Sequence, residues 1–139
     1  STQAKTLFPY TTLFRSPLRG RRVLLVDNDD QVLDSSASLL ASWGCAVRAH
    51  HGAEGATAPD APAPEVALVD MHLGGGQDGI AVVQQLRQRY GAALPALVMT
   101  GDVSVATRER VQAHGLLLLE KPLSAPRLRA ALTGVLQRV

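Results

Sequence analysis

Cysteine, lysine and long apolar runs are scarce in this chain of 139 residues, and the first and third of these scarcities each exclude a class of protein. The single cysteine, Cys45, excludes an internal disulfide and a zinc site built from several cysteines. Because it begins an apolar segment, we expect it to be a small buried residue. No run of eighteen apolar residues and no signal-peptide pattern occurs, so the sequence predicts a cytoplasmic domain without membrane contact.

The first sixteen residues are interpreted separately from the rest. Residues 6–16, TLFPYTTLFRS, match the in-frame translation of a common sequencing-library adapter. We therefore expect residues 1–16 to be an artefactual, disordered segment and exclude them from the fold, as one excludes a purification tag. The alternative is a genuine hydrophobic arm built on two leucines and two phenylalanines.

Without that segment the chain carries no net charge. The segment contains Lys5 and Arg15 and no acidic residue, so 12 of the 14 basic residues remain against 12 acidic ones. The sequence gives no support to binding of nucleic acid or of an anionic membrane, which would need a clustered basic surface. Lys121 becomes the only lysine, which suggests a site that needs a compact positive charge, although a GC-rich genome alone makes lysine rare.

The remaining residues suit one compact domain of about 120 residues with a complete hydrophobic core. Residues 17–21 are expected to be a connector. Hydrophobic periodicity predicts strands at 22–26, 45–49, 65–69, 94–99 and 116–119. It predicts helices at 31–43, 52–58, 78–90, 104–114 and after a cap at Ser124. Strict alternation of strand and helix favours a parallel sheet covered on both faces, with right-handed crossovers.

Polar residues end or follow four of these apolar strands. The acidic run from Asp27 to Asp30 follows VLLV, and Asp70 follows VALV. Thr100 follows ALVM, and Lys121 follows LLLLE. Because parallel strands present their carboxyl ends at one edge of the sheet, we expect these side chains to converge on one pocket.

Carboxylates, a hydroxyl and an amine in one pocket suit phosphoryl transfer. Asp70 can attack a phosphoryl group and form an acyl phosphate if something offsets the repulsion between two anions. The acidic run, Asp70 and a backbone carbonyl of the following loop can supply oxygen ligands to a hard cation such as Mg²⁺ or Mn²⁺. Lys121 completes the charge balance, and Thr100 offers a neutral hydroxyl to the attached phosphoryl group.

The motifs VLLVDND, LVDMHLGGGQDG, ALVMTGD and LEKPL, in this order and spacing, resemble the receiver domain of bacterial response regulators and hybrid histidine kinases. The resemblance covers residues 22–139, which we expect to form the receiver domain. It implies a flavodoxin-like (βα)5 fold, a doubly wound parallel five-stranded α/β sheet with strand order 2-1-3-4-5. It also implies a phosphorelay in which a histidine kinase or a histidine phosphotransfer domain donates a phosphoryl group from a phosphohistidine.

The resemblance assigns roles in phosphoryl transfer to individual residues. Asp70 is the expected phosphoacceptor, Thr100 the switch hydroxyl and Lys121 the lysine that balances charge. Pro122 is expected to follow a cis peptide bond. Such a domain has at most autophosphatase activity of its own, and phosphorylation is expected to shift it between two conformations.

The implied metal site contains one departure from the family pattern. Asp27, Asn28, Asp70 and the backbone carbonyl of His72 occupy the positions of the family's ligands. Asn28 stands where the family usually places a directly coordinating aspartate, which puts the metal affinity in question. Its amide oxygen or the neighbouring carboxylate of Asp29 could serve instead.

The switch surface also departs from the family pattern. The resemblance places the partner surface on residues 104–114, 116–119 and the last helix. Leu118 replaces an aromatic residue that many relatives use there. His72 and Asp102 each lie two residues beyond a key site residue, where they either tune the lifetime of the phosphoryl group or are ordinary solvated loop residues.

Three other functions are compatible with parts of the sequence. Asp27-Asn28-Asp29 resembles the nucleophile motif of haloacid-dehalogenase-type phosphatases, which would make Asp27 the nucleophile, but no late acidic metal ligand follows Glu120. Residues 74–79 fit a GxGxxG dinucleotide motif, but Asp70 would repel a pyrophosphate there. A non-phosphorylated pseudo-receiver that acts as an interaction module is the main alternative, favoured by the departures at positions 28 and 118.

The residues around the adapter-like segment suggest a larger parent protein. PLRGRR reads as a short connector, and nothing that resembles an output domain follows Val139. We expect the C-terminal receiver of a hybrid histidine kinase, with a kinase domain upstream in the same chain. A stand-alone receiver is the second possibility.

Overall fold

The computed structural model describes residues 17–58 and 60–137, so the interpretation of residues 1–16 lies outside it and stays a prediction. The strands are β1 (Arg22–Val26), β2 (Ala46–His50), β3 (Val66–Asp70), β4 (Ala96–Thr100) and β5 (Leu117–Glu120). The helices are α2 (Asp30–Ser42), α3 (Ala53–Ala56), α4 (Gly79–Tyr90), α5 (Val105–Ala113) and α6 (Ala125–Leu136). Among the described residues, no helix has both the length and the apolar character that a membrane span needs.

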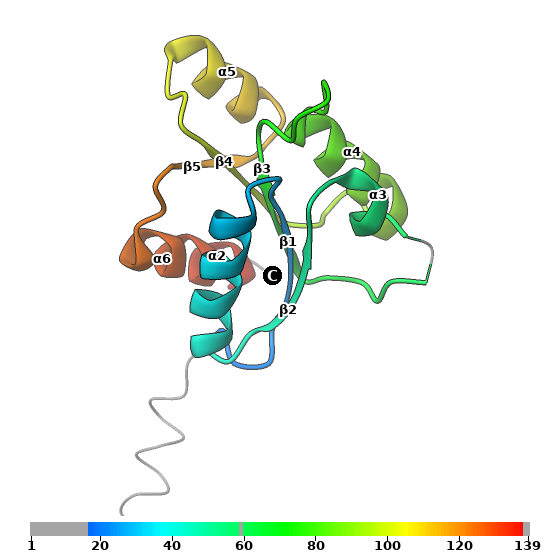
Figure 1. The fold of residues 1–139 in the computed structure, drawn as a ribbon, viewed down its shortest axis with the longest axis vertical. Coiled ribbons are helices and arrows are strands. Elements are labelled where there is room, and N and C mark those ends of the chain that lie inside the picture. Colours follow the sequence, from blue (N-terminus) through cyan, green and yellow to red (C-terminus); the bar gives the residue numbers. More distant parts are fainter. Residues whose placement is uncertain (1–16, 59, 138–139) are drawn as a thin grey trace, which may run out of the picture.

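The five strands form one parallel sheet in the order β2-β1-β3-β4-β5. Figure 1 shows α2 and α6 together against one part of the sheet, and α3 and α4 on its other side. This confirms the predicted doubly wound, flavodoxin-like fold. Because β1 and β3 are neighbours in the middle of the sheet, the chain reverses its winding direction there, which is where open α/β sheets bind ligands.

Two apolar clusters hold the helices on the sheet. Alternate residues of the strands point to opposite faces, so Leu24 packs toward α3, α4 and α5 while Leu25 packs toward α2 and α6. Leu40 on α2 and Leu86 on α4 are fully buried in the respective clusters. The central strands β3 and β4 are buried along their whole length, as expected for a parallel sheet covered twice.

The predicted elements are all present, and their ends move by a few residues. Helix α2 begins one residue early because the Asp29 side chain caps it by accepting from two backbone N–H groups. The predicted fourth strand was too long at its start, since Leu94 and Pro95 precede β4 and proline has no N–H to donate to the ladder. The predicted helix at 52–58 is a single short turn, Ala53–Ala56. Ser124 caps α6 as predicted.

The expected connector, residues 17–21, folds against the domain. Leu18 is fully buried with the α2 and α6 side chains. The Gly20 N–H donates to the Gly44 carbonyl at 2.7 Å, and the Arg21 guanidinium pairs with Glu65 at 2.6 Å. These contacts lie at the amino ends of the strands, away from the edge that carries the polar residues.

Candidate functional site

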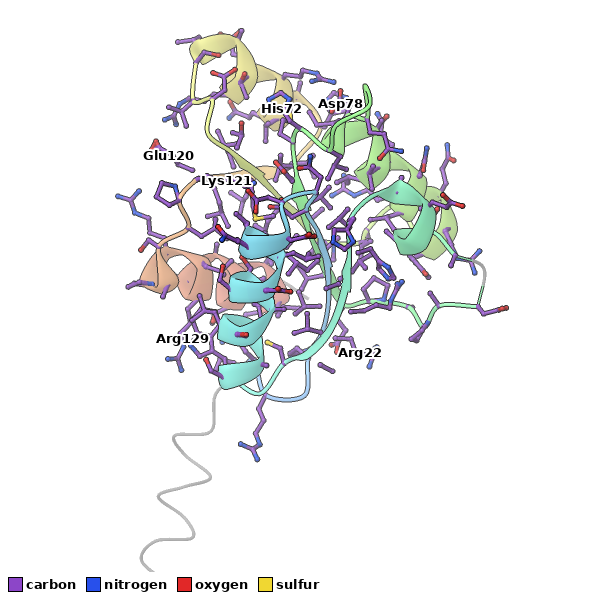
Figure 2. All side chains as sticks on the ribbon, viewed as in Figure 1. Arg22, His72, Asp78, Glu120, Lys121 and Arg129 are labelled. Carbon is purple, nitrogen blue, oxygen red and sulfur yellow. The ribbon has the colours of Figure 1, made fainter. Side chains whose placement is uncertain are left out.

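The carboxyl ends of β1, β3, β4 and β5 bring four polar side chains together. Asp27 follows β1, and Lys121 follows β5. Asp70 and Thr100 are the last residues of β3 and β4. The two aspartates and the threonine are buried, and the lysine is partly buried. Figure 2 shows Lys121 well away from Arg22, which begins β1 at the opposite end of the sheet.

The Lys121 ammonium bridges the two buried carboxylates. Its Nζ atom lies 2.8 Å from Asp27 Oδ2 and 3.1 Å from Asp70 Oδ2. Burial disfavours the charged amine, but hydrogen bonds to Asp27 and Asp70 outweigh it and raise the pKa of Lys121 above its ordinary value. The site therefore holds a fixed positive charge at neutral pH.

Backbone N–H groups orient the other oxygen of each carboxylate. Asp27 Oδ1 accepts from the Asp29 N–H at 2.9 Å, and Asp70 Oδ1 accepts from the His72 N–H at 3.2 Å. Asp27 Oδ2 is buried, and the described residues give it no hydrogen bond beyond the ion pair with Lys121. A buried carboxylate oxygen with so few partners is well suited to a cation ligand.

Asp70 carries a perturbed carboxyl group. Burial, followed by the negative charge of Asp27, raises the pKa of Asp70 above its ordinary value, despite the opposing hydrogen bonds from His72 N–H and Lys121. A carboxylate that is destabilised by its surroundings and lies beside a lysine is a typical candidate for a nucleophile.

We expect Asp70→Asn to stabilise the fold at pH 7 when divalent cations are removed by chelation. Because the raised pKa means that the folded state binds this proton more tightly than the unfolded state, stability is lost as the pH rises through the folded pKa. The neutral amide avoids that loss, so its advantage should shrink as the pH falls toward 4. Urea unfolding of both proteins at pH 4 and pH 7 measures this. An advantage that is absent at pH 7, or equal at both pH values, would contradict it.

Asn28 and His72 lie at the exposed mouth of the same pocket. The end of the Asn28 amide is 3.2 Å from the His72 carbonyl oxygen and 3.2 Å from Asp70 Oδ2. With Asp27, these groups form a set of hard oxygen donors that fits Mg²⁺ or Mn²⁺. Only two of these four donors, Asp27 and Asp70, are carboxylates. Residues 17–58 and 60–137 contain no group of three or more acidic, histidine or cysteine side chains that could hold a metal ion.

Thr100 connects the pocket to α5 through Asp102. Thr100 Oγ1 accepts from the Asp102 N–H at 3.0 Å. The Asp102 carboxylate in turn accepts from the Ser104 N–H at 3.0 Å and from the Thr107 hydroxyl at 2.8 Å, at the start of α5. These hydrogen bonds hold the pKa of Asp102 below its ordinary value. The carboxylate thus holds the turn before α5.

The remaining predicted site residues have structural contacts. Asp29 is exposed, and its Oδ1 atom accepts from the N–H groups of Gln31 and Val32 at the start of α2. Asp29 therefore serves as the N-cap of α2. The peptide bond between Lys121 and Pro122 is cis, as predicted.

The sequence interpretation gave no role in the site to two residues next to it. Asp78 caps α4 by accepting from the Ile80 N–H at 2.9 Å, and it pairs with Arg110 of α5. Gly79 lies so close to the Asp70 backbone that an added Cβ atom would be 2.2 Å from the Asp70 carbonyl oxygen. An Asp-Gly pair before an amphipathic helix could have indicated the helix cap. The contact between Asp78 and Arg110 spans 32 positions, so no local sequence pattern indicates it.

Comparison with known proteins identifies the family. Residues 23–133 match the response regulator receiver domain, so the chain belongs to this family. No curated protein matches the sequence. The structure is similar to the receiver domain of NtrX from Brucella abortus, with 25% identity and a TM-score of 0.75 over 84% of this chain and 99% of that one.

A second solved structure is similar over nearly the same length. It is the signal receiver domain of a modulated diguanylate cyclase from Desulfovibrio desulfuricans, with 28% identity and a TM-score of 0.74. The alignment covers 86% of this chain and 95% of that one. The predicted resemblance is confirmed at the level of the family and the fold.

Proposed function

We propose that this receiver domain accepts a phosphoryl group onto Asp70 from a phosphohistidine, in a reaction that depends on Mg²⁺ or Mn²⁺. The observation that carries the proposal is the buried Asp70 carboxylate at the carboxyl end of the sheet, which shares the Lys121 ammonium with the buried Asp27 carboxylate. A structural aspartate would not need a second buried carboxylate beside it, since the pair costs stability.

The proposed reaction moves one phosphoryl group between two side chains. A carboxylate oxygen of Asp70 attacks phosphorus, the P–N bond of the phosphohistidine breaks, and the imidazole leaves with the electron pair and takes up a proton. Lys121 offsets the negative charge that gathers on the phosphoryl oxygens. Thr100 is buried at the end of the neighbouring strand, where its hydroxyl can donate to the phosphoryl group after transfer.

Asp27, Asp70, the His72 carbonyl and Asn28 would hold the divalent cation. When bound, such a cation neutralises negative charge on the attacking and transferred oxygens. Backbone N–H groups hold the Oδ1 atom of each aspartate in place, and both Oδ2 atoms converge on the Lys121 ammonium.

The donor is expected to be a histidine kinase or a histidine phosphotransfer domain in the cytoplasm, and a kinase domain in the same chain is one possible source. A groove of about 480 Å³ between α2 and the loop after β5 is lined by Lys121 itself and by apolar side chains such as Leu39 and Leu123. A helix from the donor would reach the site along it. The chain's charge balance outside residues 1–16 offers no basis for a nucleic-acid partner.

The switching surface is proposed to include α5 and β5. The large apolar side chains that are exposed in the described part of the chain are Val105 on α5 and Leu117 on β5. Thr100 reaches α5 through the Asp102 hydrogen bonds, so an inward movement of Thr100 toward a phosphoryl group would pull on the start of this helix. The phosphorylated state would then present a different surface to a partner.

Intact and peptide mass spectrometry after incubation with acetyl phosphate tests the proposal. We expect one alkali-labile phosphate on Asp70 that forms with Mg²⁺ or Mn²⁺ and is reduced by at least about tenfold after chelation, since the cation offsets the repulsion between the reacting anions. A folded, cation-saturated protein that remains unmodified would favour the pseudo-receiver, which acts through its binding surface alone.

A further inference from the structure

The amide of Asn28 occupies a position between two oxygen atoms. Its terminal atom lies 3.2 Å from Asp70 Oδ2 and 3.2 Å from the His72 carbonyl oxygen, and neither of these oxygens can donate a hydrogen bond while Asp70 is ionised. The amide nitrogen in this position donates to both. The amide oxygen in this position instead completes a group of three converging oxygens, which only a cation can hold together.

An asparagine can reach either arrangement by turning its amide about the Cβ–Cγ bond, which exchanges oxygen and nitrogen without moving the backbone. The residue is exposed at the mouth of the pocket. On the side away from Asp70 the amide faces Gly74, where an added Cβ atom would lie 3.1 Å from it. The missing side chain at Gly74 therefore leaves space for the turn.

No other described carboxylate takes over the missing negative charge at position 28. Asp29 Oδ1 caps α2, and the Asp30 carboxylate pairs with His51. Asp27 and Asp70 already share the Lys121 ammonium. A cation must therefore bind to two carboxylates and two neutral ligands, the Asn28 amide and the His72 carbonyl. It must also first displace the two hydrogen bonds of the amide nitrogen. Both effects weaken binding in the absence of a phosphoryl group.

We propose that Asn28 is a reversible ligand, whose amide nitrogen closes the pocket by bonding Asp70 and His72 without a cation and whose amide oxygen turns inward to bind a divalent cation. The inference rests on the proposed function for the location of the cation, and it adds that position 28 sets the cation affinity. An aspartate cannot form the closed arrangement, since it has no donor when ionised.

Calorimetric Mg²⁺ titration of the full chain without a phosphoryl donor tests this. Asn28→Asp should bind Mg²⁺ about tenfold more tightly or better, because it adds a charged ligand and removes the competing hydrogen bonds. Asn28→Ala should bind more weakly than the unaltered chain, because the oxygen ligand is lost. Gln31→Glu is the matched control: it makes the same amide-to-carboxylate change on the exposed first turn of α2 and should alter affinity by less than about twofold.

The ¹⁵N spectrum of the Asn28 side-chain amide provides a direct readout. Its NH₂ signal is identified by its loss in Asn28→Asp and should shift on saturation with Mg²⁺, as the donated hydrogen bonds are released. Mg²⁺ affinity in Asn28→Ala equal to or above that of the unaltered chain, no gain in Asn28→Asp, or an unmoved NH₂ signal would each overturn the inference.

The two proposals fail in different ways. Phosphorylation of Asp70 together with equal Mg²⁺ affinity in the unaltered chain and Asn28→Asp would overturn the role of Asn28 alone. A tenfold gain in Asn28→Asp without phosphorylation of Asp70 in any variant would overturn the phosphoacceptor function and leave the role of Asn28 standing.

Discussion

Asp70→Asn is expected to remove all phosphate incorporation from acetyl phosphate, whereas Asp27→Asn should retain it at a rate reduced by roughly 10–100-fold, the usual cost of a perturbed metal environment. Asp70 is the last residue of a fully buried strand, and its register partner on β4, Met99, directly precedes Thr100. Its carboxylate is the proposed nucleophile, and an amide in its place leaves no group to form the acyl phosphate. Time-resolved intact mass spectrometry at saturating Mg²⁺ measures both rates.

The comparison also separates the two phosphoryl-transfer mechanisms that the sequence allows. In a haloacid-dehalogenase-type phosphatase Asp27 is the nucleophile, so loss of phosphorylation in Asp27→Asn with retention in Asp70→Asn would establish that mechanism instead. The geometry favours Asp70, because Asp27 is fully buried whereas 5% of Asp70 remains exposed to an incoming phosphoryl group. Unfolding curves for each variant show whether a loss of modification reflects chemistry or a loss of fold.

The sequence predicted the sheet and the convergence at its edge because both depend on local patterns. Buried parallel strands are short apolar runs, and a polar residue at the end of each run has only one edge of the sheet to occupy. That is sufficient to bring Asp70 to within 3.1 Å of Lys121, 51 positions away in the chain. Strand order within the sheet came from the family resemblance, since hydrophobic periodicity carries no information on neighbours.

Contacts that depend on three-dimensional packing could not be predicted from the sequence. The burial of Leu18 could not be predicted from the basic segment PLRGRR. Burial is predicted from the spacing of several apolar residues, and Leu18 is a single apolar residue among basic ones. The Asp78–Arg110 pair joins two elements whose separation depends on the packing of α4 and α5. The placement of the Asn28 amide could not be predicted either, because it requires the position of the His72 carbonyl, which the backbone of the loop after β3 determines.

Gly79→Ala is expected to destabilise the domain by about 2–4 kcal/mol, in the range of substitutions that overpack a core. An added Cβ atom would lie 2.2 Å from the Asp70 carbonyl oxygen and 2.9 Å from Met71 Cα, and both contacts are with backbone that cannot rotate away. The Gly79 N–H also donates to the Met71 carbonyl at 2.8 Å, so the start of α4 cannot retreat without losing that bond. Urea unfolding gives the change in free energy.

Gly134→Ala is the matched control, because α6 places position 134 where an added Cβ atom meets nothing within 4 Å. There the same change should stabilise the domain by about 0.5–1 kcal/mol, the ordinary gain for replacing glycine inside a helix. Equal effects of the two substitutions would contradict the role of close packing at Gly79.

The Cβ atom added in Gly79→Ala would press on the backbone of Asp70 itself. We therefore expect the phosphorylation rate of this variant to fall even under conditions where it is fully folded. The rate of Gly134→Ala should stay unchanged. The absence of a side chain at Gly79 is therefore expected to determine both the stability of α4 and the position of Asp70.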